Sequence, residues 1–507
     1  MHKLAILPLV CIFLIIYQNG VSQNHDHDSF QEYAQSSFSD FKDLLSLPND
    51  ALFPNDIEEN VKWCEENFSK RGFTHTRLET PGAPLLLAEK KTSIKRAKTV
   101  LVYLQIDGQP VDTSYWLQKS PYEPVLKQAK SNGSWEQIDW NLLEEEDINP
   151  DWRIFARSAS DAKGPVLMFL TAMDMMISEG KNPNFNLKVI MDFEEEMGSP
   201  NLPEAVGQYG EHLAADMLVI FDGPLHITNK PTLTFGARGI STITLTTFGA
   251  IAPQHSGHYG NYLPNPAIRL SRLIASMKDD HGRVTIPGFY DGINISDPVK
   301  EVLRAVPDDE SFINAKLGIF SPDSVAPNYQ ESLQYPSLNV RGLSSGWVGT
   351  ASRTIVPANA TAEIDIRLVI ESDPERLLGL VRGHILSQGY HITDRSPTTE
   401  ERAAYERICQ FNSETSYLAF RTDFDSEVGI WLDKALTKAH GAPPIKQRTS
   451  GGSIPISPFV NQLGIPAVTV PTVNRDNNQH SPNENIRIGN YIDGIKTIYA
   501  ILLEPLK

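Results

Sequence analysis

Alternating strand-like and helix-like segments constrain the fold of this chain more than any other feature of its sequence. Short apolar runs typical of buried strands are separated by longer segments in which apolar residues recur at helical spacing. The predicted strands lie at 98–106, 187–193 and 217–221, and the predicted helices at 162–180 and 202–213. Strands that alternate with helices in this way form a mostly parallel sheet covered by helices. The sequence therefore predicts an α/β domain.

The pattern changes near residue 233, where the β-rich run ISTITLTTFG begins a different unit. Its predicted elements are strands at 232–248, 361–370 and 390–393 and helices at 265–277 and 374–388, with a long irregular region at 279–350. This order of strands and helices predicts a small α+β sandwich. The α/β pattern returns at 427–441 and ends with a helix at 491–503, so we expect the smaller domain to be inserted into the larger one.

The first residues have the pattern of a signal peptide. Lys3 precedes an apolar run at 4–17, and the small residues Gly20 and Ser22 suit cleavage before Gln23. A membrane anchor is the alternative, but the apolar run is short for a membrane span. We therefore expect an exported protein, periplasmic or secreted, with no membrane segment after cleavage. The predicted boundaries are a signal peptide at 1–22, a catalytic domain at 23–232 and 401–507, and an inserted lid or dimerisation domain at 233–400.

Charge and cysteine content exclude some partners. The 507-residue chain has a formal net charge of −17 and no Lys- or Arg-rich block, which argues against nucleic acid and anionic membranes as partners. Two of its three cysteines, Cys64 and Cys409, remain after removal of Cys11 with the signal peptide. We expect both to be free thiols, although two distant cysteines in an exported protein could pair.

Acidic residues and histidines follow several predicted strands. The segments are SASDAKG with Asp161, FEEEMGS with Glu194 to Glu196, FDGP with Asp222, QHSGHYG with His255 and NQHSPNEN with His480. Taken singly, Asp161 could be a helix cap, Asp222 a turn residue and the Glu run a solvated surface. Carboxylates gathered at one edge of a sheet repel one another, and a metal ion with oxygen and imidazole ligands offsets that repulsion.

These segments, together with GGSIP at 451–455, resemble a family of two-zinc hydrolases that includes glutamate carboxypeptidase, aminoacylase and carnosine dipeptidase. The resemblance covers roughly residues 55–505. It implies a phosphorylase/hydrolase-like α/β catalytic domain with an inserted α+β dimerisation domain. It also implies that Asp161 bridges two metals, that Glu196, Asp222 and His480 are further metal ligands, and that Glu195 is the general base.

The resemblance assigns further residues to the substrate. His255 would reach across a dimer to the partner's active site and stabilise the oxyanion of the reaction intermediate. Arg367, in IDIRLV, would hold the carboxylate of the substrate, and Thr354 and Ser453 would contact the substrate as well. The resemblance therefore implies one protein partner, a second copy of the chain, in a homodimer formed through the inserted domain.

The segment YLQIDGQPVD departs from the family pattern. The family has His, any residue, then Asp at this point, where the His binds zinc and the Asp orients it. Here Asp107 is present, but residue 105 is Gln. A neutral amide oxygen is a much weaker zinc ligand than imidazole. We therefore expect one tight zinc, bound by Asp161, Glu196 and His480, and a second, weak zinc site at which Gln105 replaces the histidine. Other divalent metals are also compatible with these ligands.

The sequence thus predicts an exported metallopeptidase or amidohydrolase of the dipeptidase, carboxypeptidase or aminoacylase type. Its expected substrate is a small peptide or N-acyl amino acid with a free carboxylate. The alternatives are an enzyme that works with a single metal and a protein that has lost hydrolysis and only binds small peptides. The intact Glu195, His255 and Arg367 argue against loss of hydrolysis, because a decayed site would be free to lose several members.

Overall fold

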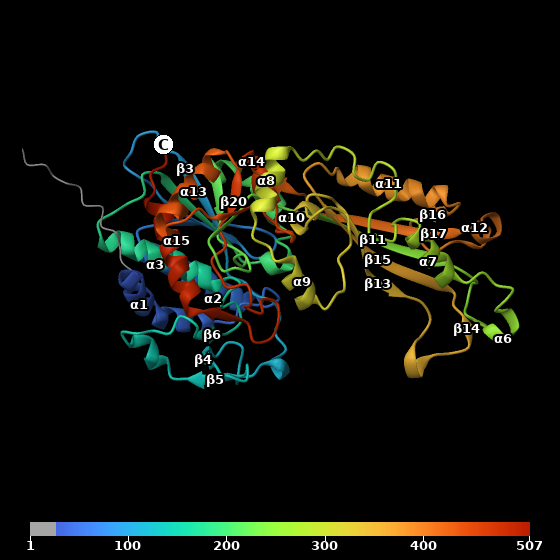
Figure 1. Ribbon diagram of the computed structural model, residues 1–507, viewed down its shortest axis with the longest axis horizontal. Coiled ribbons are helices and arrows are strands. Elements are labelled where there is room, and N and C mark those ends of the chain that lie inside the picture. The colour runs from blue at the N-terminus through green and yellow to red at the C-terminus, as the bar shows by residue number, and fades with distance from the viewer. Residues whose placement is uncertain (1–26) are drawn as a thin grey trace, which may run out of the picture.

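The structure, a computed structural model, describes residues 27–507 and consists of two β-sheet units that lie next to each other (Figure 1). The larger unit contains both the first and the last part of the described chain, and the smaller unit is formed by the middle part. The expected signal peptide at 1–22 lies outside the described residues. Within 27–507, no helix combines the length and apolar character needed to cross a membrane.

An eight-stranded sheet forms the centre of the larger unit. Its strand order is β1-β2-β7-β3-β8-β20-β9-β19, with parallel pairing among the four central strands β7, β3, β8 and β20. The strands are β1 (Thr74–Leu78), β2 (Leu85–Lys90), β3 (Thr99–Gln105), β7 (Asn186–Asp192), β8 (Met217–Ile220), β9 (Thr232–Thr234), β19 (Ile445–Gln447) and β20 (Ala467–Thr469). The predicted α/β class is confirmed.

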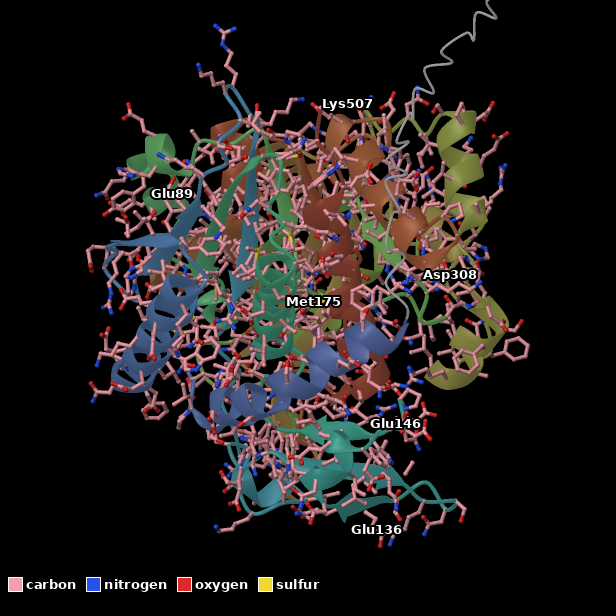
Figure 2. The ribbon with its side chains drawn as sticks, turned by 90° about the vertical axis from the view of Figure 1, so that its left-hand side faces the viewer. Glu89, Glu136, Glu146, Met175, Asp308 and Lys507 are labelled. Atoms are coloured by element: carbon pink, nitrogen blue, oxygen red, sulfur yellow. The ribbon has the colours of Figure 1, made fainter. Side chains whose placement is uncertain are left out.

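Helices cover both faces of this sheet, so β3 is apolar on both sides. Val100, Val102 and Leu104 pack in a core with the helices of one face, whereas Leu101 and Tyr103 pack with those of the other. The first face carries α1 (His27–Ser46), α2 (Pro54–Lys70), α3 (Lys163–Ser178), α13 (Glu427–His440) and α15 (Ile488–Leu503), and the second carries α4 (Leu202–Gln208), α5 (Gly210–Leu213) and α14 (Ser457–Leu463). Figure 2 shows Met175 of α3 in this interior, with Glu89 and Glu136 at the periphery.

A separate four-stranded sheet, which the sequence did not predict, lies at one side of the larger unit. Its order is β21-β6-β4-β5, and its strands are β4 (Val125–Ala129), β5 (Trp135–Ile138), β6 (Arg153–Phe155) and β21 (Asn485–Arg487). The pairing of β6 with β21 brings the chain before α3 beside the chain before α15. Segments more than 300 residues apart therefore meet at this point.

The smaller unit is a five-stranded sheet of order β13-β15-β11-β17-β16, with helices on one face. Its elements are β11 (Gly239–Phe248), β13 (Ser337–Ser344), β15 (Asn359–Leu368), β16 (His391–Thr393), β17 (Ile408–Tyr417), α7 (Pro266–Ala275), α11 (Pro374–Ser387) and α12 (Thr399–Ala404). A two-stranded ribbon of β12 (Gln254–His255) and β14 (Ile355–Val356) carries the short helix α6 (Ser256–Tyr259). Segment 279–335 contains α8 (Asp297–Ala305), α9 (Glu310–Leu317) and α10 (Tyr329–Ser332).

Two features of the smaller unit differ from the sequence-based expectation. Strand β13 falls inside the region expected to be irregular. Its apolar and polar residues alternate only over 338–341, and a bulge interrupts its pairing with β15 directly after Val340. Strand β17 pairs with β11, although it follows the expected boundary at residue 400. We therefore propose that the inserted unit comprises residues 239–417. Cys64 and Cys409 are buried free thiols, as expected.

Candidate metal centre

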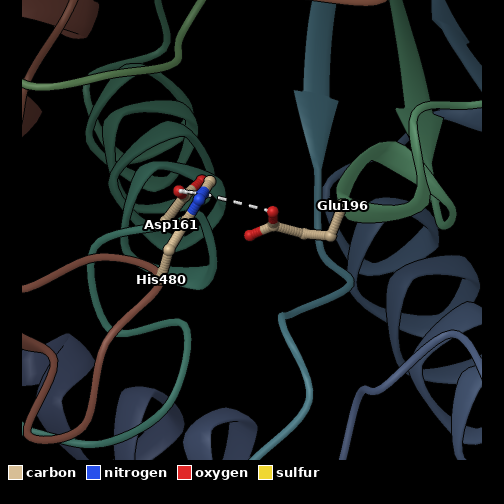
Figure 3. Close-up of side chains that lie close together, drawn as sticks. All are labelled: Asp161, Glu196 and His480. Carbon is tan, nitrogen blue, oxygen red and sulfur yellow. Dashed lines mark hydrogen bonds and ion pairs between the residues drawn. The ribbon is translucent and has the colours of Figure 1, made fainter. Parts of the chain in front are cut away.

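Three predicted metal ligands converge in the larger unit, as Figure 3 shows. Asp161 lies directly before α3, Glu196 lies in a 3-10 turn (Glu195–Met197) after β7, and His480 lies in the loop between β20 and β21. Nε2 of His480 is 3.0 Å from Oδ2 of Asp161 and 3.2 Å from Oε2 of Glu196. One ligand atom of each residue lies within 4.8 Å of the others. Two carboxylates and an imidazole at this spacing fit a divalent metal ion.

The turn that carries Asp161 is fixed by a buried carboxylate, Glu484. Its Oε1 accepts hydrogen bonds from the backbone N–H groups of Ser160 and Asp161, both at 3.0 Å. Its Oε2 accepts hydrogen bonds from the N–H of Ser158 and from Nη1 of Arg157, both at 2.8 Å. Since Glu484 belongs to the same loop as His480, one residue links the two segments that supply metal ligands.

A second buried carboxylate, Asp107, fixes the turn that carries Glu195 and Glu196. Its Oδ1 accepts a hydrogen bond from the backbone N–H of Glu195 at 3.1 Å, and its Oδ2 accepts one from that of Glu196 at 3.0 Å. These bonds hold the 3-10 turn against the end of β3. As a result, the two adjacent glutamates are presented at the edge of the sheet in a defined orientation.

Burial and mutual repulsion raise the pKa values of Glu195, Glu196 and Asp222. Burial raises the pKa of Glu195 well above its ordinary value, and the negative charges of Asp222 and Asp161 raise it further. The same causes, burial first and then Asp161, raise the pKa of Glu196 to about 8 and that of Asp222 to about 7. The hydrogen bond to Asp161 raises the pKa of His480 to about 9. A cation among these groups would stabilise their ionised forms.

Gln105 occupies the position expected for the first ligand of a second metal. It is buried, and its Nε2 donates hydrogen bonds to Oδ1 of Asp161 at 3.0 Å and to Oε2 of Glu195 at 3.2 Å. Its Oε1 is buried without a hydrogen-bond partner in the described chain. Among residues 27–507, the one group of three or more acidic, histidine or cysteine residues close enough to hold a metal is Asp161, Glu196 and His480. The second position, with a neutral amide, fits a metal poorly.

Comparison with known proteins identifies the family. The sequence profile described as peptidase family M20/M25/M40 matches residues 125–504, which is well over half of the chain. The chain belongs to peptidase family M20/M25/M40. The family resemblance that the sequence motifs indicated is therefore confirmed.

Members of the M20/M25/M40 family that resemble this chain include named dipeptidases. The Cys-Gly metallodipeptidase DUG1 of Saccharomyces cerevisiae is 25% identical over 92% of this chain and 94% of its own length. The Beta-Ala-His dipeptidase of Mus musculus is 26% identical over 84% of this chain and 81% of its own length. Among solved structures, the M20 family metallo-carboxypeptidase Sso-CP2 from Sulfolobus solfataricus has a TM-score of 0.73 and 27% identity over 92% of this chain and 98% of its own.

The four residues that were expected to contact the substrate lie in two separate places in this M20/M25/M40 family chain. Nη1 of Arg367, on β15, donates a hydrogen bond to Oγ of Ser453 at 2.8 Å. His255 and Thr354 are exposed neighbours on the β12–β14 ribbon, where the backbone oxygen of Thr354 accepts a hydrogen bond from the N–H of Ser256 at 3.0 Å. In Figure 1, β14 and α6 lie at the end of the smaller unit that points away from the larger one. Within one chain, His255 therefore does not reach Asp161.

Three residues that the sequence analysis did not assign also contact the cluster. Nε2 of Gln109 donates a hydrogen bond to Oε2 of Glu196 at 3.0 Å, and Nε2 of Gln479 donates one to Oδ2 of Asp161 at 3.1 Å. Glu484 is the third. All three lie within four residues of an assigned member of the M20/M25/M40 motifs. Their closeness to these motifs in the sequence could have identified them.

Proposed function

We propose that this protein is a metal-dependent hydrolase that cleaves the amide bond of a dipeptide or N-acyl amino acid with a free carboxylate. The observation that carries the proposal is the convergence of Asp161, Glu196 and His480 beside Glu195. Two of the relatives named above are dipeptidases, and this supports a small peptide as the substrate.

In this proposal Asp161, Glu196 and His480 hold a zinc ion, which when bound polarises a carbonyl and lowers the pKa of a water molecule. Glu195 accepts the proton of the attacking water and transfers it to the leaving amine. Asp107 keeps Glu195 in place through the backbone of the 3-10 turn. Asp222, which raises the pKa of Glu195, would belong to the second metal position together with Asp161 and Gln105. We infer that this position binds zinc weakly, because Gln105 is neutral.

The functional unit of this proposal is a homodimer formed through the inserted unit. His255 and Thr354 are exposed at the end of that unit, far from the metal ligands of their own chain. A histidine placed there can stabilise an oxyanion only in the site of a partner. Arg367 and Ser453, which lie nearer the larger unit, would bind the carboxylate of the substrate.

Export by the segment at 1–22, to the periplasm or the medium, is also part of the proposal.

Metal analysis combined with a substrate panel tests this proposal. The purified protein is assayed with dipeptides and N-acyl amino acids, then treated with a chelator, and finally supplied again with zinc. We expect hydrolysis of at least one class, loss of hydrolysis on chelation and recovery with zinc. A protein that retains dipeptides without cleaving them, at any metal concentration, would instead be the binding protein considered above.

A further inference from the structure

A second arginine, Arg238, lies buried at the junction between the two units and is not used in the proposal above. It directly precedes β11, and 7% of its surface is exposed. Its Nη2 donates a hydrogen bond to the backbone oxygen of Tyr335 at 2.8 Å. Its Nε is buried and has no hydrogen-bond partner among the described residues. A buried guanidinium with an unused donor is costly, so an acceptor from outside the chain would stabilise it.

Strand register places Arg238 beside the arginine assigned to the substrate, Arg367. Strands β11 and β15 are antiparallel, and Ile240 pairs with Arg367. Because side chains alternate along a strand, Arg238, two residues before Ile240, belongs to the same face of the sheet as Arg367. Burial and then the positive charge of Arg367 lower the pKa of Arg238 to about 10, and this agrees with two neighbouring guanidinium groups.

The loop that contains Ser453 connects the two arginines. The backbone N–H of Arg238 donates a hydrogen bond to the oxygen of Gly452 at 3.3 Å, and Arg367 donates one to Oγ of Ser453 at 2.8 Å. The backbone of Arg238 and the guanidinium group of Arg367 therefore contact neighbouring residues of the 450–453 turn. A ligand bound at Ser453 would lie close to both positive charges.

The chain itself provides one carboxylate near these arginines, that of Asp365, and this carboxylate already has partners within the chain. Asp365 lies 3.8 Å from Nε of Arg367 and accepts a hydrogen bond from Nδ2 of Asn339 at 2.9 Å. The charge of Asp365 also acts on Arg238, so this one carboxylate faces two guanidinium groups. Carboxylates are the preferred anionic partners of guanidinium groups, because two parallel N–H···O bonds can form.

We propose that Arg238 and Arg367 together bind the free carboxylate of the substrate, so that selection for that carboxylate rests on a pair of arginines. This inference rests on the proposed function and adds to it a residue that determines specificity. In this arrangement the unused Nε–H of Arg238 donates a hydrogen bond to the carboxylate, while its Nη2 stays on Tyr335. A dipeptide whose carboxylate is converted to an amide loses both ionic partners.

Calorimetry on zinc-loaded Glu195→Gln protein tests this inference without turnover. The probes are the dipeptide Cys-Gly and the same dipeptide with a C-terminal amide, and the quantity measured is the ratio of their affinities. Arg238→Met should lower the preference for the free acid about 10-fold, as expected for loss of a hydrogen bond between charged groups. Arg341→Met is the matched control, because Arg341 lies on the same sheet, exposed and paired with Glu363 at 3.5 Å, and should leave the ratio unchanged.

Turnover by the otherwise wild-type protein gives a second measurement. Arg238→Lys keeps the charge but not the paired donors, so we expect KM for the free acid to rise several-fold with a smaller change in kcat. The Lys variant replaces the Met variant in calorimetry if the latter does not fold. An unchanged ratio of affinities in a folded Arg238 variant would contradict the inference alone. Failure of the parent protein to bind either form would contradict the proposed function as well.

Discussion

At residue 105, a neutral amide donates hydrogen bonds to the carboxylates of Asp161 and Glu195. We expect Gln105→His to raise the zinc content toward two per chain, because imidazole is a far better zinc ligand than an amide. Elemental analysis after dialysis against dilute zinc measures this content. Gln137→His, on the exposed face of β5, controls for a histidine that binds zinc elsewhere. Unchanged content in the Gln105 variant would show that residue 105 does not contact the metal position.

His480 is the one imidazole of the described metal cluster, and its side chain is half exposed. We expect His480→Ala to remove the tightly bound zinc and hydrolysis together, since two carboxylates alone are a weak zinc site. Zinc content and activity are measured on the same preparation. His281→Ala, an exposed histidine of the inserted unit, should change neither quantity. Equal zinc content in the two variants would make His480 an ordinary loop histidine.

At the scale of elements, the sequence predicted several that are rich in buried apolar side chains. β3, β8 and α3 were found because they are mostly apolar, and β7 because of its apolar run at 189–191. The equally apolar strand β2 was missed, the short strand β5 is mostly polar, and the alternation of β13 is interrupted by a bulge after Val340. The order of the motifs indicated the ligands, but only the pairing of β6 with β21 explains why Asp161 and His480 meet. Glu484 could be singled out by its closeness to His480 in the sequence, but its hydrogen bonds to the turn of Asp161 depend on that pairing and could not be predicted.

The β6–β21 junction also leads to a prediction about stability. Glu484→Gln should lower the free energy of unfolding by about 3 kcal/mol, because it leaves the buried Arg157 without its ionic partner. It should also weaken zinc binding, since the turn of Asp161 loses part of its support. Denaturant titration with and without chelator measures both effects. Glu136→Gln, which removes an exposed ion pair of the same sheet, should change stability by less than about 1 kcal/mol.

At the scale of the whole molecule, the β12–β14 ribbon lies at the end of the smaller unit that points away from the larger one, and this supports the proposal that His255 acts in the site of a second chain. We expect Glu195→Gln protein and His255→Ala protein to be inactive separately and to regain activity when mixed. A hybrid dimer contains one site with its own Glu195 and the partner's His255. Subunit exchange is verified independently with two fluorescent labels. If the labels exchange and no activity returns, the role of His255 across the dimer is wrong.

The proposed hydrolysis depends above all on Glu195, which moves the proton at the metal centre. The most direct measurement is therefore zinc content and turnover of Glu195→Gln protein, made on one sample beside the wild type. Gln keeps the size and most hydrogen bonds of Glu but cannot accept the proton. We expect unchanged zinc content, unchanged affinity for a dipeptide and a loss of turnover of about 100-fold or more. Turnover within a few-fold of the wild type would contradict this expectation.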